Sequence, residues 1–368
     1  MNWYPIWSYH FQNYESLPAE SAGMNQIIHF FSPLETKAVR ILFSNSQGED
    51  PVLFDQAGIR TDREEKSLQF DGQSRLLLAP GEERWSDPVR IRIPAGEAFV
   101  LSAWVEGKIT SYAGLNNDSV FRVSFSDHRG EDIRPEQISR AAERKFNPYV
   151  YFGVRTIEVL TEDRAEIITA FGDSLVQQGH WFQEWYKLLL QKGKRSVLLN
   201  EGISGNRVLR DASSSSRLNS IFGEAGIKRI RKDVFGRYQP DQVILAEGIN
   251  DLVHPGDGCS LEELPCAKEL IEGIKELGCL VRREGSCPVF VTLSPFCDYD
   301  GIWSEEREAI RQEVNSWIRQ QESVMDADAF VRDAGRRERL QEQYDSGDHL
   351  HLNRAGGCRI AGKWEERR

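Results

Sequence analysis

Four short segments of this chain combine side chains of the kinds that nucleophilic catalysis needs. They are Gly172-Asp173-Ser174, Gly202-Ile203-Ser204-Gly205-Asn206, Gly248-Ile249-Asn250-Asp251 and Asp348-His349-Leu350-His351. The first follows an apolar run and presents a serine on a tight turn. In an α/β fold such a turn exposes a nucleophile, and the amide groups at the start of the next helix face the group under attack. A serine is a weak nucleophile until a nearby base takes its proton.

Each segment taken alone is also ordinary turn or helix-capping chemistry. Gly-Asp-Ser suits a turn, Asn250 followed by Asp251 suits a helix N-cap, and Gly205 suits a positive φ. Three of the four segments directly follow apolar runs, however, and the fourth carries both Asp and His. Turn chemistry does not explain that combination, so we ask which elements would bring the four together.

After about residue 163 the sequence alternates between short apolar runs and helical stretches. The apolar runs lie at 167–171, 196–199, 242–246, 289–293 and 329–331, and the helical stretches lie at 181–191, 218–231, 261–284, 305–322 and 354–366. Buried strands joined by helices predict a mostly parallel sheet that is covered on both faces, a three-layer α/β/α domain. In such sheets ligands bind beyond the carboxyl ends of the strands, where three of the four segments stand.

The part of the chain before this alternation has short β-type runs separated by turn residues. They lie at 26–31, 38–43, 67–70, 75–78, 89–93, 99–104, 120–125 and 150–160. Many alternate apolar and polar residues, as in Val-Arg-Ile-Arg-Ile at 89–93, which predicts half-buried antiparallel strands in an all-β sandwich of jelly-roll type. Residues 116–118 and 139–146 are expected in long loops or a short helical excursion. We therefore expect two domains, 1–162 and 163–368.

The composition narrows the compartment and the partners. A net charge of −11 argues against nucleic acid and anionic membrane surfaces. The first residues show neither a basic region nor a long apolar stretch, and no later run is long enough to span a bilayer, so we expect a cytoplasmic protein. The six cysteines lack paired metal-ligand spacing, so reduced thiols are expected and no metal or cofactor is. Oligomeric state cannot be read from the sequence.

The four segments together resemble the SGNH branch of the GDSL-type esterases and lipases, a family named for one Ser, Gly, Asn and His in four blocks. Here these are Ser174, Gly205, Asn250 and His351, in the family order, over about residues 165–357. The resemblance implies a flavodoxin-like hydrolase domain. Many relatives carry a proline after the catalytic His, whereas Leu352-Asn353 follows here, which should alter the stiffness of the loop more than the chemistry.

The first half of the chain also resembles a β-sandwich that precedes the hydrolase domain in one bacterial subgroup of this family. This second resemblance rests on Asn25-Gln26-Ile27-Ile28-His29 and Ser86-Asp87-Pro88-Val89 together with the strand pattern.

The family resemblance gives each residue a role that acyl transfer requires. Ser174 is expected to be the nucleophile, His351 its base, and Asp348 the carboxylate that orients the imidazole. The backbone N–H groups of Ser174 and Gly205, with the side-chain amide of Asn250, are expected to form the oxyanion hole.

Several neighbours are expected to support the site. Asp173 should brace the nucleophile turn through backbone hydrogen bonds, and Glu247 and Asp251 are candidates for support from behind. Trp181 and His180 either line the pocket or belong to a packed helix start. Arg207 either meets an anionic substrate group or forms a surface ion pair. His349 is expected to be solvent-facing or structural.

These roles predict a serine esterase that cleaves an ester through an acyl-enzyme. We expect a short acyl group, such as O-acetyl on a carbohydrate, because no long apolar lid or tunnel segment is visible. One alternative is a lysophospholipase or thioesterase that uses the same triad. An alternative of another class is an inert carbohydrate-binding protein.

Overall fold

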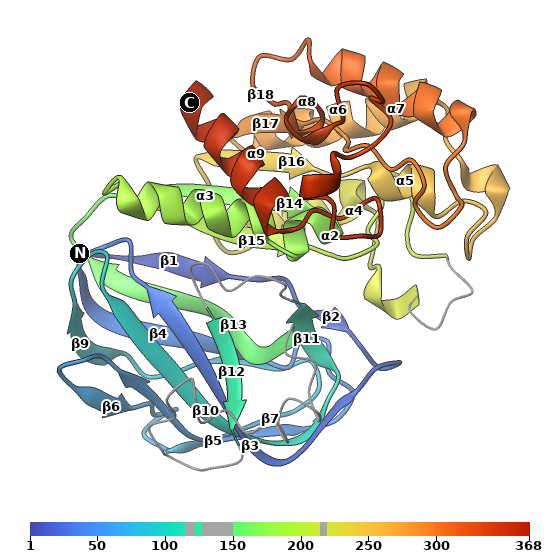
Figure 1. Ribbon diagram of the computed structural model, residues 1–368. Coiled ribbons are helices and arrows are strands. Elements are labelled where there is room, and N and C mark those ends of the chain that lie inside the picture. Colours follow the sequence, from blue (N-terminus) through green and yellow to red (C-terminus); the bar gives the residue numbers. More distant parts are fainter. Residues whose placement is uncertain (115–121, 127–149, 214–218) are drawn as a thin grey trace. The chain divides into compact units, whose positions relative to one another are not determined.

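The structure, a computed structural model, describes residues 1–114, 122–126, 150–213 and 219–368 (Figure 1). Contacts divide the chain into two units. One is Met1–Ala165 with Leu189–Leu199, and the other is Glu166–Leu188 with Asn200–Arg368. The loops expected at 116–118 and 139–146 lie outside the described residues.

The first unit holds two antiparallel β-sheets. In the seven-stranded sheet the order is β2-β11-β13-β4-β8, with β1 paired to β13 and β9 to β4. These strands are β1 (Asn2–Ser8), β2 (Gln12–Asn13), β4 (Thr36–Ser44), β8 (Glu83–Trp85), β9 (Val89–Ile93), β11 (Ser111–Gly114) and β13 (Val150–Thr161). In the six-stranded sheet the order is β12-β3-β10-β5-β6, with β7 paired to β5. Its strands are β3 (Ala19–Phe31), β5 (Val52–Arg60), β6 (Glu65–Ser67), β7 (Arg75–Leu78), β10 (Ala98–Ile109) and β12 (Arg122–Ser126).

Aromatic side chains from the two sheets meet in the core between them. Trp7 of β1 contacts Phe30 of β3 with ring centroids 4.8 Å apart, and Phe43 of β4 contacts Phe54 of β5 at 5.1 Å. Such inward-facing rings supply most of the apolar area that holds two sheets together. The predicted β-sandwich is confirmed.

The second unit is built on a five-stranded sheet in the order β15-β14-β16-β17-β18. The strands are β14 (Glu166–Gly172), β15 (Ser196–Gly202), β16 (Gln242–Ala246), β17 (Cys287–Val291) and β18 (Val324–Met325). From β14 through β18 the neighbouring pairs are all parallel. The α-helices are α2 (Ser174–Gln177), α3 (His180–Gln191), α4 (Gly226–Phe235), α5 (Ile249–Val253), α6 (Ala267–Arg283), α7 (Glu305–Ile318), α8 (Ala327–Val331) and α9 (Arg354–Arg367). Single 3-10 turns are η2 (Asn219–Ile221), η3 (Leu261–Glu263) and η4 (Glu342–Tyr344).

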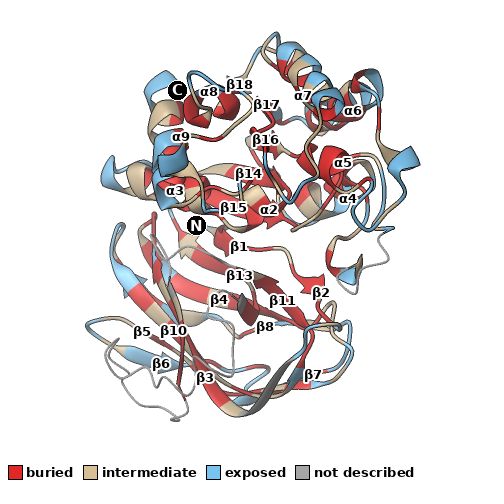
Figure 2. Ribbon diagram, turned by 45° about the vertical axis from the view of Figure 1, so that its right-hand side comes forward, coloured by how far each residue is buried: buried red, intermediate tan, exposed pale blue. Residues whose placement is uncertain are grey.

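Helices cover both faces of this parallel sheet, as the alternating pattern predicted (Figure 1). Helix α6 packs on β16 and β17 and contacts α4 and α7 on one face. On the other face α3 and α9 meet through Trp185 and Trp364, whose ring centroids are 6.3 Å apart. Buried residues follow the strands and the inner helix faces, and exposed residues gather on the outer helix faces (Figure 2). The three-layer α/β/α architecture is confirmed.

Among the described residues, four predicted elements differ from the structure. Of the run predicted as a strand at 67–70 only residue 67 lies in a strand, β6, and the helix predicted over 218–231 is divided into η2 and α4. The run at 329–331, predicted as a strand, belongs to α8, and the edge strand β18 precedes it. Asp326 caps this helix by accepting from the backbone N–H of Ala329, and a short apolar run does not by itself distinguish strand from helix. The helix predicted over 261–284 is divided into η3 and α6, because Pro265 interrupts it.

All six cysteines are free thiols. Among the described residues, no helix combines the length and the apolar composition needed to cross a membrane.

Candidate active site

Ser174 lies at the carboxyl edge of the parallel sheet, on the turn between β14 and α2. Asp173 caps α2 with a 2.9 Å hydrogen bond from the backbone N–H of Leu175 to its Oδ1. A Cβ atom at Gly172 would lie 2.0 Å from the carbonyl oxygen of Ala246 on β16, so only glycine fits there. The turn therefore packs its backbone directly against the end of β16.

The loop between η4 and α9 brings a histidine and an aspartate to this serine. Ser174 Oγ lies 2.8 Å from His351 Nε2, and His351 Nδ1 lies 2.6 Å from Asp348 Oδ2. Asp348 Oδ1 also accepts hydrogen bonds from the backbone N–H groups of His351 and Leu350, at 2.8 and 3.0 Å. The three side chains form one continuous hydrogen-bonded series in the order serine, imidazole, carboxylate.

The surroundings of Asp348 favour its charged form. Partial burial raises its pKa, but the imidazole of His351 and the two backbone N–H groups outweigh that effect and hold the pKa below its usual value. Asp348 is therefore ionised at neutral pH and accepts the Nδ1–H of His351.

A second Asp–His pair lies in the same loop. His349 Nδ1 lies 2.7 Å from Asp345 Oδ2, and the His349 side chain is 49% exposed. His349 also has a φ of +70°, which is uncommon for a residue with a side chain. The expected reading of His349 as solvent-facing or structural agrees with its exposure and its pairing.

Asn206 connects Gly205 with Asn250, because it follows Gly205 in the chain and its backbone carbonyl accepts a hydrogen bond from Asn250. Gly205 lies in the turn after β15 with a φ of +73°, and its N–H donates to no acceptor in the part of the chain that the structure describes. Asn250 Nδ2 donates to the carbonyl of Asn206 at 3.0 Å and is buried. The N-cap position of α5 is Gly248, so the alternative reading of Asn250 as an N-cap is wrong.

Three buried carboxyl groups lie behind these residues. Burial raises the pKa of Asp173 to about 7, of Glu247 to about 8 and of Asp251 to about 6. Asp251 accepts from the backbone N–H groups of Val208 and Leu209 at 2.7 and 3.0 Å, which oppose the rise. Asp251 thus ties α5 to the loop that follows Gly205. Glu247 makes no hydrogen bond with any of the expected oxyanion donors.

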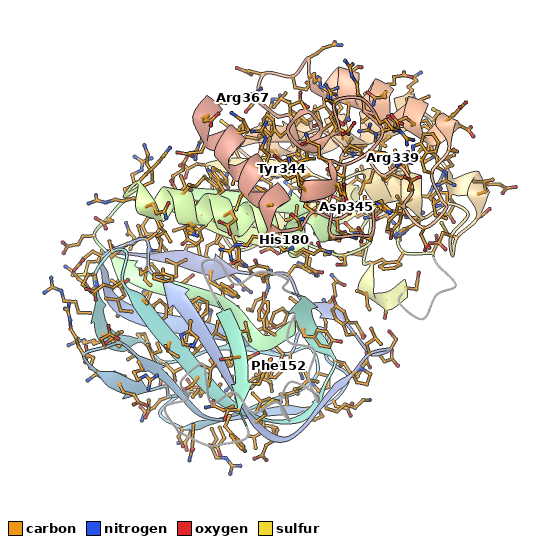
Figure 3. The ribbon with its side chains drawn as sticks, in the orientation of Figure 1. Phe152, His180, Arg339, Tyr344, Asp345 and Arg367 are labelled. Carbon is orange, nitrogen blue, oxygen red and sulfur yellow. The ribbon has the colours of Figure 1, made fainter. Side chains whose placement is uncertain are left out.

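The remaining expected neighbours have mixed roles. Trp181 is buried, donates from Nε1 to the carbonyl of Leu175 at 3.0 Å and also lines the pocket described below. His180 lies at the start of α3 against Gly357 of α9 (Figure 3). Arg207 is buried and pairs with Glu263 at 2.8 Å, so the reading as a surface ion pair is wrong about its location.

Three residues of this region were not expected from the sequence. Asn206 accepts from Asn250, Phe222 packs on Gly205, and Arg229 of α4 donates to Asn206 Oδ1 at 2.6 Å. Nothing distinguishes Arg229 from the other basic residues of its helix in the sequence, because its contacts with Gly172, Glu201 and Asn206 come from distant segments.

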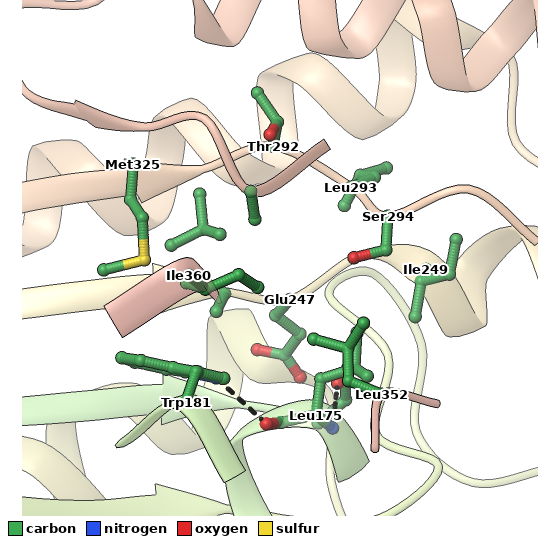
Figure 4. A pocket seen from close by; sticks show the side chains of 14 residues that line it. Leu175, Trp181, Glu247, Ile249, Thr292, Leu293, Ser294, Met325, Leu352 and Ile360 are labelled. Atoms are coloured by element: carbon green, nitrogen blue, oxygen red, sulfur yellow. Dashed lines mark hydrogen bonds between the residues drawn. The ribbon is translucent and has the colours of Figure 1, made fainter. Parts of the chain in front are cut away.

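A pocket opens beside the segments that carry Ser174, Asn250 and His351 (Figure 4). Leu175, Ile249 and Leu352 line it, and these are the chain neighbours of Ser174, Asn250 and His351. Its empty space is about 430 Å³, including its mouth, and most of the lining is apolar. Glu247 is also part of the lining, and among the described residues neither of its carboxyl oxygens has a hydrogen-bond partner.

Metal ligation is not indicated by the described residues, where no group of three or more His, Cys, Asp and Glu side chains is arranged to hold an ion. The arrangement instead combines a hydroxyl, an imidazole and an ionised carboxylate, which are the parts of acyl transfer by a serine nucleophile.

Comparison with solved structures finds similar proteins at low sequence identity. An acetyl xylan esterase, AlAXEase, is 18% identical, with 55% of this chain and 98% of that chain covered and a TM-score of 0.41. A putative lipolytic protein of the G-D-S-L family from Desulfitobacterium hafniense DCB-2 is 16% identical, with 55% and 98% covered and a TM-score of 0.40. Axe2, an acetylxylan esterase from Geobacillus stearothermophilus, is 18% identical, with 55% and 93% covered and a TM-score of 0.41.

No curated protein matches this chain in sequence. The family model described as GDSL-like Lipase/Acylhydrolase, in contrast, matches residues 170–357, just over half of the chain. That match includes the Ser174 turn, the segment with Gly205, the segment with Asn250 and the loop with Asp348 and His351. The chain is a hydrolase and belongs to the GDSL-like lipase/acylhydrolase family.

Proposed function

We propose that this protein is a serine esterase in which Ser174, His351 and Asp348 form the catalytic triad. The observation that carries the proposal is the hydrogen-bonded series of these three side chains, with 2.8 Å between Oγ and Nε2 and 2.6 Å between Nδ1 and Oδ2. Residues 163–368 form the catalytic domain in this proposal, and residues 1–162 form the β-sandwich that precedes it.

Catalysis begins when His351 Nε2 takes the hydroxyl proton of Ser174 as Oγ attacks the ester carbonyl. Asp348 holds the imidazole in the tautomer that leaves Nε2 free to accept, and it stabilises the imidazolium that forms. The imidazolium then gives its proton to the leaving alcohol, and an acyl-enzyme remains. Water, activated by the same imidazole, hydrolyses this intermediate and restores the serine.

The tetrahedral intermediate carries a negative oxygen that needs hydrogen-bond donors. As the first residue of α2, Ser174 has a backbone N–H with no acceptor inside the helix. The N–H of Gly205, which donates to no acceptor among the described residues, and the second amide hydrogen of Asn250 are the other donors in the proposal. Loss of one such donor typically costs about 2.7–4 kcal/mol of transition-state stabilisation.

The substrate in this proposal is a short-acyl ester, such as an O-acetyl ester, with a carbohydrate as the alcohol. The short acyl group rests on the sequence, in which no long apolar lid or tunnel segment is visible. The carbohydrate rests only on the resemblance of the first unit to the sandwich of one bacterial subgroup.

Hydrolysis of chromogenic acyl esters from acetyl to palmitoyl tests the proposal. We expect the acetyl ester to be cleaved fastest by the wild type, and Ser174→Ala to lower kcat by about 10³-fold or more. Equal rates for the two proteins would exclude Ser174 as the nucleophile. A maximum at long chains would favour a lysophospholipase, and no Ser174-dependent cleavage of any ester would favour an inert carbohydrate-binding protein.

A further inference from the structure

Arg229 of α4 is buried at the carboxyl edge of the parallel sheet, where it contacts the ends of three neighbouring strands. Its Nη2 donates to the carbonyl of Gly172, which ends β14, at 2.8 Å. Its Nη1 donates to the carbonyl of Glu201 on β15 at 2.9 Å. On the side of β16, Nη2 lies 3.7 Å from Glu247 Oε1. One guanidinium group therefore links β14, β15 and β16.

The same side chain also reaches the Gly205 loop. Arg229 Nε donates to Asn206 Oδ1 at 2.6 Å, and the Asn206 amide donates to the carbonyls of Phe222 and Glu224 at 2.6 and 2.8 Å. The backbone carbonyl of Asn206 accepts from Asn250. Asn206 is thus held on its side chain by Arg229 and on its backbone by Asn250.

Through these contacts Arg229 bonds to residues that lie next to, or contact, each proposed donor of the oxyanion hole. Gly172 precedes Ser174 by two residues, Asn206 follows Gly205 directly, and Asn250 donates to Asn206. We propose that Arg229 is a positioning residue that fixes the spacing of the Ser174, Gly205 and Asn250 donors. This inference rests on the proposed function, because it assigns a task to Arg229 only if those three groups stabilise an oxyanion.

The guanidinium group suits this task in a way that an ammonium group does not. It is planar and carries five N–H donors in a fixed fork, and it is also stacked over the ring of Phe171 at 3.9 Å. Asp233, at 3.1 Å from Nη1, supplies a compensating negative charge. A lysine could keep the charge near Asp233, but its single nitrogen could not bond Gly172, Glu201 and Asn206 at once.

The test compares Arg229→Lys and Arg229→Met with the matched variants Arg311→Lys and Arg311→Met. Arg311 is also fully buried and pairs with Asp328 at 2.7 Å, but it contacts none of the three donors' segments. Steady-state kinetics on a chromogenic acetyl ester are measured where circular dichroism shows each variant to be folded. We expect Arg229→Lys to lower kcat by about 10–100-fold, the size of effect that a displacement near 1 Å produces, with KM nearly unchanged. The Arg311 variants should lose thermal stability while keeping kcat within about twofold, since they leave the donors in place.

A double-mutant cycle with Asn250→Ala separates positioning from general stability. If Arg229 acts through the hole, the double variant should lose less kcat than the product of the two single losses. If Arg229→Met does not fold, Arg229→Lys carries the cycle. The positioning role would be overturned if the double variant lost kcat by the full product of the two single losses. It would also be overturned if Arg229→Lys had the same kcat as Arg311→Lys. A wild-type protein without Ser174-dependent hydrolysis would instead contradict the proposed function.

Discussion

The loop from Asp345 to His351 contains two Asp–His pairs of nearly equal geometry, at 2.7 and 2.6 Å. The pairs differ in their surroundings. Asp348 accepts two backbone N–H groups of its own loop, and its imidazole partner reaches Ser174. Asp345 likewise accepts from two backbone N–H groups, those of Gly347 and His349, but its imidazole partner is 49% exposed. The loop thus provides an internal control for the role of the orienting carboxylate.

Replacement of Asp348 by Asn should keep the shape of the loop but lower kcat by about 10²–10⁴-fold, because an amide no longer holds the imidazole in the required tautomer. Asp345→Asn should leave kcat within a few-fold of the wild type. Steady-state kinetics of both variants, with melting temperatures as a check on folding, measure the difference. Equal losses in the two variants would argue against a special role for Asp348.

Glu247 gives a prediction about stability and pH. Its pKa in the folded state is raised from 4.5 to about 8, mainly by burial, so the folded protein binds more protons than the unfolded chain between these values. The contribution of this group to stability is therefore fully present below pH 4.5 and is lost as the pH rises through 8. Glu247→Gln removes the titration. Its stability relative to the wild type should rise between pH 5 and 9, by up to a few kcal/mol at about 1.4 kcal/mol per pH unit.

Urea unfolding at a series of pH values measures this difference. A constant gap between the two proteins across the range would mean that Glu247 is not protonated in the folded state.

At the scale of elements, the turn after β15 depends on Gly205. Its φ of +73° disfavours any residue with a Cβ, and a Cβ there would lie 2.1 Å from Cδ1 of Phe222. Gly205→Ala should therefore lower the free energy of unfolding by about 1–3 kcal/mol and also lower kcat, because the N–H at this position moves. Gly193→Ala is the matched control, since Gly193 has a φ of +65° but open space around it.

Denaturant unfolding and kinetics of the two variants separate the effect of backbone strain from the effect of moving the Gly205 N–H. The control should lose about 1 kcal/mol of stability and no turnover. If Gly205→Ala keeps the turnover of the wild type, its N–H is not part of the oxyanion hole.

Much of the fold could be predicted from local patterns. The alternation predicted at 89–93 matches the burial in β9. The stretch predicted as helical at 261–284 contains α6, whose residues Leu270, Ile274, Leu277 and Val281 are buried. Strand β5 was not predicted, because Gln56 has a positive φ and the pairing with β10 shifts register nearby, which breaks the alternation. Strand β1 contains Pro5, which obscured it.

In the site, too, the features that depend on neighbouring residues could be predicted, and those that depend on contacts between distant residues could not. The four segments were visible because each is a short stretch that ends a strand or precedes a helix. The roles of Arg229 and Asn206 were not visible, because their partners are set by packing. Arg229 bonds Gly172, which is 57 residues away, and Asn206 meets Asn250, which is 44 residues away. A single sequence carries no signal for such pairs.

At the scale of the whole chain, a hydrolase unit and an antiparallel sandwich occur in one protein with a net charge of −11. That charge leads us to expect neutral esters as substrates in preference to polyanions. The family model covers only residues 170–357, so the family accounts for the reaction type and leaves the sandwich without an assigned role.

The central claim is that Ser174 forms a covalent acyl-enzyme, and labelling by a fluorophosphonate probe tests it most directly. The account predicts one label per chain by intact mass, located at Ser174 by peptide mapping. The label should be absent in Ser174→Ala and much slower to form in His351→Ala, since the imidazole must take the hydroxyl proton. An unlabelled wild-type protein that still hydrolyses esters, or a label at another residue, would contradict the account.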